Sequence, residues 1–294
     1  MAKKGLTIGI PTYDRCDAIG ALLNRIVDAG INRIEDVEIL VIDDDSPDGT
    51  FSRIEKYSGA GGIRVLTNPT RLGFQGNFLN VIAECDTEYV LYMADDDLVI
   101  EEGIRQLLQY IAAIPVDVAL ISSLFYRSGS IYRGNDKEIR LIGLAEFQSS
   151  CSHLPGIVLN KRLAMDVIDK LKPFLLDDYN VYPQCCIALM FLIQKLPCVY
   201  VPFEVARTGL DLPSRLTGYQ TITGRWRQFL FFAEFMEHIA AMMEAPDEAE
   251  RALALLEQHK RSLFRLLGAG IRAEAPEYAE YYLEGAKDVI LRRR

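Results

Sequence analysis

The feature that most constrains the fold is an alternation, within the first 125 residues, of short apolar runs and segments with helical periodicity. The apolar runs are rich in β-branched residues and cover 6–10, 37–42, 63–66, 89–93 and 117–123. The helical segments cover 17–29, 50–58, 74–85 and 101–113. Unbroken apolar runs are typical of parallel strands that are covered on both faces. The sequence therefore predicts an α/β fold with a mostly parallel, doubly wound sheet flanked by helices.

The remainder of the chain is predicted to extend this core and then to become helical. Strands are predicted at 156–160 and 198–202, and helices at 161–171, at 183–195 and from 221 to the end, with breaks near Pro246 and Pro276. Pro183 suits the first position of its helix. We therefore expect a sheet-based domain over 1–215 and a helical C-terminal region over 216–294.

Composition argues against several classes of protein. A formal net charge of −9 argues against a nucleic-acid groove as the main function, because such grooves need clustered Lys and Arg. Six Cys without a CxxC pair, together with only three His, argue against a zinc site and favour free thiols in a cytoplasmic protein. The N-terminal apolar run is too short for a signal peptide, and no apolar stretch has the length of a membrane-spanning helix.

Polar residues follow the predicted strands at their carboxyl ends. They include "PTYDR" (11–15), "DDDSPDG" (43–49), "NPTR" (68–71) and "ADDD" (94–97). Ligands of doubly wound sheets bind beyond the carboxyl ends of the strands, so these segments are expected to line one site. Within the second segment, Ser46 and Asp48 are expected to cap the next helix, which leaves Asp43 and Asp44 for another role.

Three adjacent carboxylates, those of Asp95, Asp96 and Asp97, close the fourth apolar run. Two like charges ~4 Å apart repel by about 4 kcal/mol at an effective dielectric constant near 20. One Asp would favour the positive N-terminal end of the following helix, but three exceed that need. A divalent cation such as Mg²⁺ or Mn²⁺, which takes one or two carboxylates together with phosphate oxygens of a substrate, explains the cluster better.

Four stretches, in this order, resemble the family 2 glycosyltransferases with the GT-A fold. They are "IPTYDR" (10–15), "LVIDDDSPDGT" (40–50), "NPTRLGFQGN" (68–77) and "YMADDDLVI" (92–100), and the last stands where that family has its DxD metal motif. The resemblance covers residues 5 to 205. It implies that the domain over 1–215 binds a nucleotide sugar and carries out catalysis. The implied reaction is metal-dependent transfer of a sugar from a nucleotide-diphosphate donor to an acceptor hydroxyl, in polysaccharide, glycan or glycolipid assembly.

The resemblance also implies a nucleotide site and a metal site. The implied nucleotide-binding residues are Pro11, Thr12, Tyr13, Arg15, Asp43, Asp44, Arg71 and Asp95. Among them, Asp44 would contact the base, Arg15 the phosphates, and Asp95 the ribose or donor sugar. The metal would be bound mainly by Asp96, which thereby takes part in catalysis, with Asp97 in support.

Two departures from the family pattern concern catalysis. Ala94 stands where the first Asp of the DxD motif usually lies, and the "ED" pair that supplies the base of inverting members is absent. In its region stands "LLDDYNVYPQCC" (175–186), which is similar to a pattern in abequosyltransferase-like members. Asp178 is our first candidate for the base that takes the acceptor proton. The alternative candidates are Asp177, Gln184 and His153, and a capped helix start with a surface His would explain these residues equally well.

Two other functions stay open. A sugar-phosphate nucleotidylyltransferase shares a similar core, but it needs a Gly-rich basic loop after the first strand, and "PTYDRCDA" (11–18) is not one. A degenerate glycosyltransferase that only binds a nucleotide sugar would account for Ala94 and the missing "ED" pair.

The expected partners are a nucleotide-diphosphate sugar and a saccharide or lipid-linked acceptor. Segment 224–243 is apolar around much of its circumference, which is typical of a packed core helix. A homodimer interface is a second interpretation of this segment. A third is peripheral contact with the inner face of the cell membrane, which the terminal "LRRR" (291–294) would favour.

Overall fold

The computed structural model describes residues 3–114, 117–127, 129–134, 137–151, 153–180, 182–209 and 222–243, with short stretches between 246 and 284. The chain divides into two compact units. One comprises Met1–Leu175 and Tyr182–Leu212, and the other comprises Leu176–Val181 and Pro213–Arg294. The functional roles expected for 1–215 and 216–294 stay predictions.

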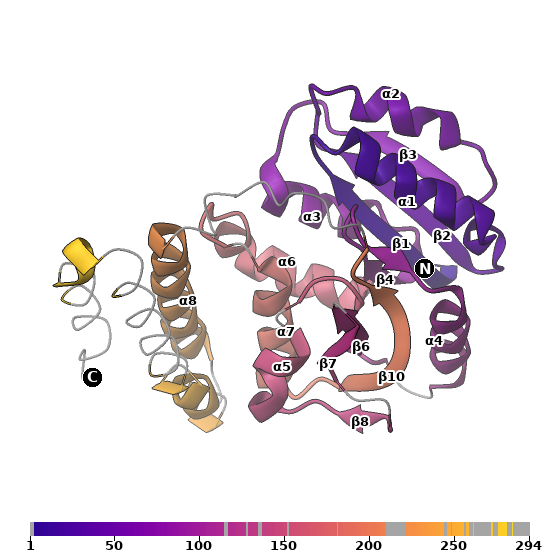
Figure 1. The fold of residues 1–294 in the computed structure, drawn as a ribbon. Coiled ribbons are helices and arrows are strands. Elements are labelled where there is room, and N and C mark those ends of the chain that lie inside the picture. Colours follow the sequence, from indigo (N-terminus) through magenta and orange to yellow (C-terminus); the bar gives the residue numbers. More distant parts are fainter. Residues whose placement is uncertain are drawn as a thin grey trace. The chain divides into compact units, whose positions relative to one another are not determined.

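The first unit is built on one sheet (Figure 1), whose strands within the described residues number ten. They are β1 Lys3–Thr12, β2 Val37–Asp43, β3 Ile63–Thr67, β4 Thr87–Tyr92, β5 Leu98–Val99, β6 Leu120–Arg127, β7 Ser130–Arg133, β8 Arg140–Leu141, β9 Ile157–Asn160 and β10 Cys198–Arg207. The strand order is β3-β2-β1-β4-β9-β6-β10-β5, with β7 paired to β6 and β8 paired to β10.

Helices connect these strands. Those of the first unit are α1 Cys16–Asp28, α2 Thr50–Ile54, α3 Gly73–Glu84, α4 Glu101–Ala113, α5 Phe147–Cys151, α6 Lys161–Leu175 and α7 Pro183–Ile193, with 3₁₀ turns η1 Ile31–Arg33, η2 Glu55–Tyr57 and η3 Leu144–Glu146. The second unit contains α8 Ile222–Met242 and the 3₁₀ turn η5 Pro276–Tyr278. Buried aromatic side chains, including Trp226, Phe231 and Phe235, line α8, as its apolar sequence predicts.

Strand directions decide which residues share an edge of the sheet. β1 is parallel to β2 and β4, and β2 is parallel to β3. β9 runs antiparallel to both β4 and β6, so β4 and β6 point the same way, and β10 is parallel to β6. The carboxyl ends of β1, β2, β4, β6 and β10 therefore lie at one edge, which we call the carboxyl edge.

Helices cover both faces of the sheet, which confirms the predicted fold class. On one face, Ile19 of α1, Ile54 of α2 and Ile104 of α4 belong to a single buried cluster with Ile8 of β1. On the other face, α3 lies against β1 and β2, and α6 lies against β4 (Figure 1). The approach of α3 requires a glycine, because a Cβ added at Gly9 would lie 2.3 Å from Val81 Cγ1.

Candidate functional site

The loops that follow β1 and β2 at the carboxyl edge are fastened to each other. Three consecutive backbone N–H groups of the first loop donate to three side chains of the second. The pairs are Asp14 N to Ser46 Oγ at 2.9 Å, Arg15 N to Thr50 Oγ1 at 3.2 Å and Cys16 N to Asp48 Oδ2 at 3.1 Å. Asp48 Oδ1 also accepts from the Thr50 N–H at 3.0 Å, at the start of α2. The "DDDSPDGT" segment thus holds the "PTYDR" loop in one conformation.

Asp43 and Asp44 are both buried and use their carboxylates within these loops. Asp43 accepts from the backbone N–H and the hydroxyl of Ser46, at 3.1 and 2.5 Å. Asp44 Oδ1 accepts from Asn68 Nδ2 at 2.7 Å and from the Leu72 N–H at 2.8 Å. Asp44 therefore positions the loop that follows β3. Its contact with a nucleotide base stays a prediction.

A chain of asparagine amides, which the strand-end motifs did not predict, supports the loop that follows β3. Asn77 Nδ2 donates to the Ile42 carbonyl at 3.0 Å, and Asn68 Nδ2 lies 3.2 Å from Asn77 Oδ1. Asn80 Nδ2 donates to Asn68 Oδ1 at 2.7 Å. The three Asn of "NPTRLGFQGNFLN" (68–80) were the available signal.

Two of the residues expected at the nucleotide site, Tyr13 and Arg71, lie in direct contact. The guanidinium carbon of Arg71 lies 4.1 Å from the centroid of the Tyr13 ring, which is a cation–π geometry. Thr12, at the end of β1, donates its hydroxyl to Asp95 Oδ2 at 2.8 Å. These contacts bring the loops after β1, β3 and β4 to one place at the carboxyl edge.

The three carboxylates after β4 have different surroundings. Asp95 accepts the Thr12 hydroxyl, and Asp97 Oδ1 accepts the Gly209 N–H at 3.2 Å. Asp96 Oδ2 lies 3.9 Å from Arg15 Nη1, and both side chains are about one third exposed, at 34% and 29%. This ion pair is long, and within the described part of the chain no other Lys or Arg lies at ion-pair distance from the three carboxylates.

The electrostatics of the cluster reflect this imbalance. Burial raises the pKa of Asp95 to about 6, although the Thr12 hydrogen bond lowers it. Burial and the neighbouring Asp96 raise the pKa of Asp97 to about 7, against the opposing effects of the Gly209 N–H and Arg127. Ionising both groups near neutral pH therefore costs free energy, which a bound cation would offset.

A cation site made by protein side chains alone is not present in the described part of the chain. No three His, Cys, Asp or Glu side chains among those residues gather in a geometry that would hold an ion. The oxygen donors of Asp96 and Asp97 fit Mg²⁺ or Mn²⁺ only if other ligands complete the coordination. Mg²⁺ is typically bound in this way, by one or two carboxylates with waters and substrate phosphates.

The candidate bases fall into two groups. Asp177 and Asp178 belong to the second unit, where Asp177 Oδ1 accepts the Tyr179 N–H at 2.8 Å and Asp178 is exposed. The assignment of Asp178 as the base stays a prediction. Gln184 belongs to the first unit, and its buried amide nitrogen and oxygen have no hydrogen-bond partner in the described structure.

His153, the last candidate, is packed between aromatic rings. Its ring centroid lies 4.4 Å from that of Phe125 and 5.2 Å from that of Tyr132. Burial lowers the pKa of His153 to about 3, and the charges of Arg133 and Arg127 lower it further. A neutral imidazole of this kind is a weak base at neutral pH.

Two residues that the sequence analysis did not single out shape the same edge. The guanidinium of Arg133 is fully buried and donates to three backbone carbonyls, those of Ser123, His153 and Pro155, at 2.8, 2.6 and 2.6 Å. Gly209 crosses the "ADDD" loop so closely that an added Cβ would lie 2.1 Å from the Asp96 carbonyl oxygen. Neither contact has a local sequence signal, because each joins segments far apart in the chain.

The family model described as "Glycosyl transferase family 2" matches residues 7–184, which is more than half of the chain. The chain belongs to glycosyl transferase family 2. This confirms the resemblance drawn from the four strand-end motifs. The abequosyltransferase-like subgroup stays a prediction.

One curated relative of this family 2 chain is the poly(ribitol-phosphate) beta-N-acetylglucosaminyltransferase TarS of Staphylococcus aureus. It is 31% identical over 113 residues, which span 38% of this chain and 20% of TarS. The match therefore covers only about a fifth of the length of the relative.

Solved structures of glycosyltransferases share the fold. A mannosyltransferase from Pyrobaculum calidifontis, in complex with GDP-Man and Mn²⁺, is 18% identical with a TM-score of 0.59, over 99% of this chain and 88% of that one. TarS residues 1–349, in complex with UDP-GlcNAc, are 15% identical with a TM-score of 0.56, over 98% and 90%. These likenesses confirm the fold class expected from the sequence. No helix among the described residues is long and apolar enough to cross a membrane.

Proposed function

We propose that this chain transfers a sugar from a nucleotide-diphosphate donor to an acceptor hydroxyl, with a divalent cation at Asp96 and Asp97. The observation that carries the proposal is the carboxylate cluster after β4, whose charge is poorly compensated and partly desolvated. Family membership supports the reaction class. The Mn²⁺ and GDP-Man in the complex of the Pyrobaculum mannosyltransferase support the cofactor and the donor class.

The loops at the carboxyl edge supply the donor site in this proposal. Tyr13 and Arg71 form one wall for the nucleoside, with Asp44 beneath the loop that carries Arg71. Arg15 contacts the phosphates and Asp95 contacts the ribose or donor sugar. Because the first two loops are already fastened by three hydrogen bonds, binding would not have to order them.

Catalysis then needs a base and a stabilised leaving group. A bound cation would supply neutralisation of the charge that develops on the leaving nucleoside diphosphate. The oxygen of the acceptor hydroxyl attacks the anomeric carbon of the donor sugar, and Asp178 takes the hydroxyl proton. The reaction is a single displacement with inversion. The pKa of about 3 makes His153 poorly suited to that task.

A binding-only function is the second candidate, because Ala94 removes one carboxylate and the described side chains form no complete ion site. Both candidates predict nucleotide binding, so turnover separates them. Release of nucleoside diphosphate from radiolabelled UDP-, GDP- and dTDP-sugars, with and without added acceptor, would be measured. The transfer proposal expects release that needs Mn²⁺ or Mg²⁺, and no release from any donor would overturn it.

Binding itself is tested by thermal melting. A nucleoside diphosphate at 100 times its dissociation constant should stabilise the fold by about 2.7 kcal/mol when Mn²⁺ is present. With EDTA the gain should be much smaller, because the carboxylates then face the phosphates without a cation between them. Equal stabilisation in both conditions would contradict a metal-bridged site.

A further inference from the structure

We propose that the β6–β7 hairpin is an acceptor subsite for a saccharide bearing an anionic group, with Tyr132 as the sugar platform and Arg127 as the anion contact. This inference rests on the proposed function, since it names the acceptor class of the same site. A net charge of −9 does not oppose it, because one arginine that has no carboxylate within ion-pair distance among the described residues can attract an anionic group locally, even though its charge also acts on Asp97.

The topology places the hairpin beside the carboxylate cluster. β6 ends at Arg127 and points the same way as β4, so both end at the carboxyl edge. A short path of hydrogen bonds joins the two ends. Thr208 N donates to the Tyr126 carbonyl at 3.1 Å, and the next residue, Gly209, donates to Asp97 at 3.2 Å.

Two exposed arginines end neighbouring strands at this edge, and among the described residues only Arg207 forms an ion pair with a carboxylate. Arg207 at the end of β10 donates to both carboxylate oxygens of Glu204, at 2.5 and 2.7 Å. Among the residues that the structure describes, Arg127 has no carboxylate within ion-pair distance, and its guanidinium carbon lies 5.5 Å from the Tyr132 ring centroid. Its planar fork of donors therefore stays available for a phosphate or carboxylate.

The ring beside Arg127 is held firmly while its surface stays open. Tyr132 is 51% exposed, and its ring meets that of His153 edge-on, with 5.2 Å between centroids. The Phe125 ring packs against that of His153, with 4.4 Å between centroids, and the buried guanidinium of Arg133 donates to the His153 carbonyl. An exposed aromatic face with a fixed orientation and an adjacent cation suits a sugar ring that carries a charged substituent.

The inference is tested by equilibrium binding in EDTA and without nucleotide, so that it does not depend on turnover. The probes are glucose 6-phosphate and glucuronate, which separate phosphate from carboxylate recognition, with glucose as the neutral control. We expect wild-type protein to bind at least one anionic sugar fivefold or more tightly than glucose. Arg127→Gln should remove that preference, and Arg127→Lys should keep part of it. The matched control Arg207→Gln should leave it within twofold.

Further arms separate this subsite from the donor site. Arg15→Gln should leave the preference unchanged, whereas Tyr132→Ala should weaken binding of the anionic sugar without altering binding of inorganic phosphate. Equal binding of glucose and both anionic sugars would overturn the inference, as would a preference that is lost in Arg15→Gln and kept in Arg127→Gln. Donor turnover without acceptor, measured on the same proteins, reports on the proposed function separately, and Arg207→Gln should leave it unchanged.

Discussion

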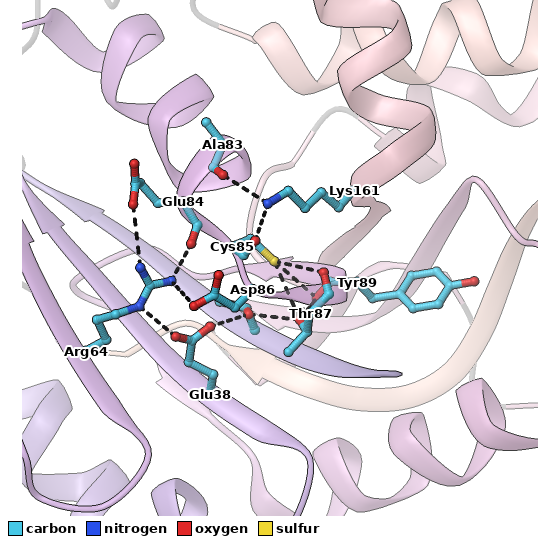
Figure 2. Close-up of polar contacts among 10 residues, drawn as sticks. Glu38, Arg64, Ala83, Glu84, Cys85, Asp86, Thr87, Tyr89 and Lys161 are labelled. Carbon is cyan, nitrogen blue, oxygen red and sulfur yellow. Dashed lines mark hydrogen bonds and ion pairs between the residues drawn. The ribbon is translucent and has the colours of Figure 1, made fainter. Parts of the chain in front are cut away.

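At the amino-terminal edge of the sheet three carboxylates converge on one arginine, whereas at the carboxyl edge three carboxylates stand beside an arginine that hardly reaches them. Figure 2 shows the first group: Arg64 lies 2.8 Å from Glu38, 3.5 Å from Glu84 and 3.3 Å from Asp86. Lys161 donates to the Ala83 carbonyl at 3.0 Å and to the Cys85 carbonyl, at the end of α3 (Figure 2). The corresponding contact at the carboxyl edge, Arg15 to Asp96, measures 3.9 Å.

The comparison distinguishes carboxylates that form ion pairs within the protein from carboxylates that we propose bind a ligand. The carboxylates around Arg64 are paired closely, and Asp86 is 76% exposed, so water solvates it as well. The carboxylates after β4 are less closely paired, and burial raises the pKa values of two of them, Asp95 and Asp97. The same residue types thus stabilise the fold at one edge and, in the proposed function, bind a ligand at the other. Exchanging one carboxylate at each edge tests this distinction.

The largest effect is expected from Asp96→Asn, which should abolish transfer. The substitution keeps the shape of the side chain but removes one negative charge from the metal site, and it relieves repulsion in the metal-free protein. The melting temperature should hold or rise. The matched variant Asp86→Asn at the other edge should transfer sugar normally, and wild-type activity in Asp96→Asn would rule out the metal assignment.

Asp178→Asn should have the next largest effect on rate. Loss of a general base lowers the transfer rate by about 10²–10⁴, with little change in donor affinity. Single-turnover transfer and donor binding would be measured side by side, with Asp177→Asn as the neighbouring control. Near wild-type rates in both variants would show that neither Asp177 nor Asp178 is the catalytic base. The inverting mechanism would then have no support.

The metal-free protein should lose stability as pH rises. The folded-state pKa values of Asp95 and Asp97, about 6 and about 7, exceed the usual 3.8, so protonation favours the folded chain. That contribution, on the order of a few kcal/mol, is complete below about pH 4 and is lost as pH rises through 6 and 7. Melting between pH 4 and 8 in EDTA should show the decline, and Asp97→Asn should flatten it. A wild-type melting temperature that stays constant over this pH range would contradict the prediction.

The smallest effect is expected at the other edge. Arg64→Gln should cost about 1 kcal/mol or less of unfolding free energy, because its ion pairs are partly exposed and screened by water. The loss should shrink further at high salt. Transfer and nucleotide affinity should be unchanged, and a defect in either would show that the two edges are not independent.

The sequence predicted the long elements well and the short ones poorly. Runs such as 37–42 and 101–113 carry enough periodicity to reveal β2 and α4. β5 and β8 have two residues each, which is too few to show any period. The strand at 156–160 was expected, but its antiparallel direction, which reverses the sheet between β4 and β6, has no sequence signal.

The candidate site was predictable where it depends on strand ends and not where it depends on distant contacts. Tyr13, Arg71 and Asp95 were placed correctly at one edge because parallel strands bring their carboxyl ends together. The role of Arg133 was not predictable, since its acceptors are backbone carbonyls up to 22 residues away. The contact of Gly209 with Asp97 spans 112 residues.

The contact between Gly209 and Asp97 means that the residues after β10 and the loop 94–97 must move together. Gly209 holds Asp97 by its N–H and leaves no room for a Cβ above the Asp96 carbonyl, so even Gly209→Ala must displace one backbone against the other. If a cation binds at Asp96 and Asp97 as proposed, any ligand that favours one position of Thr208 and Gly209 would therefore also change the affinity for that cation. By linkage, the cation changes the affinity for that ligand by the same factor.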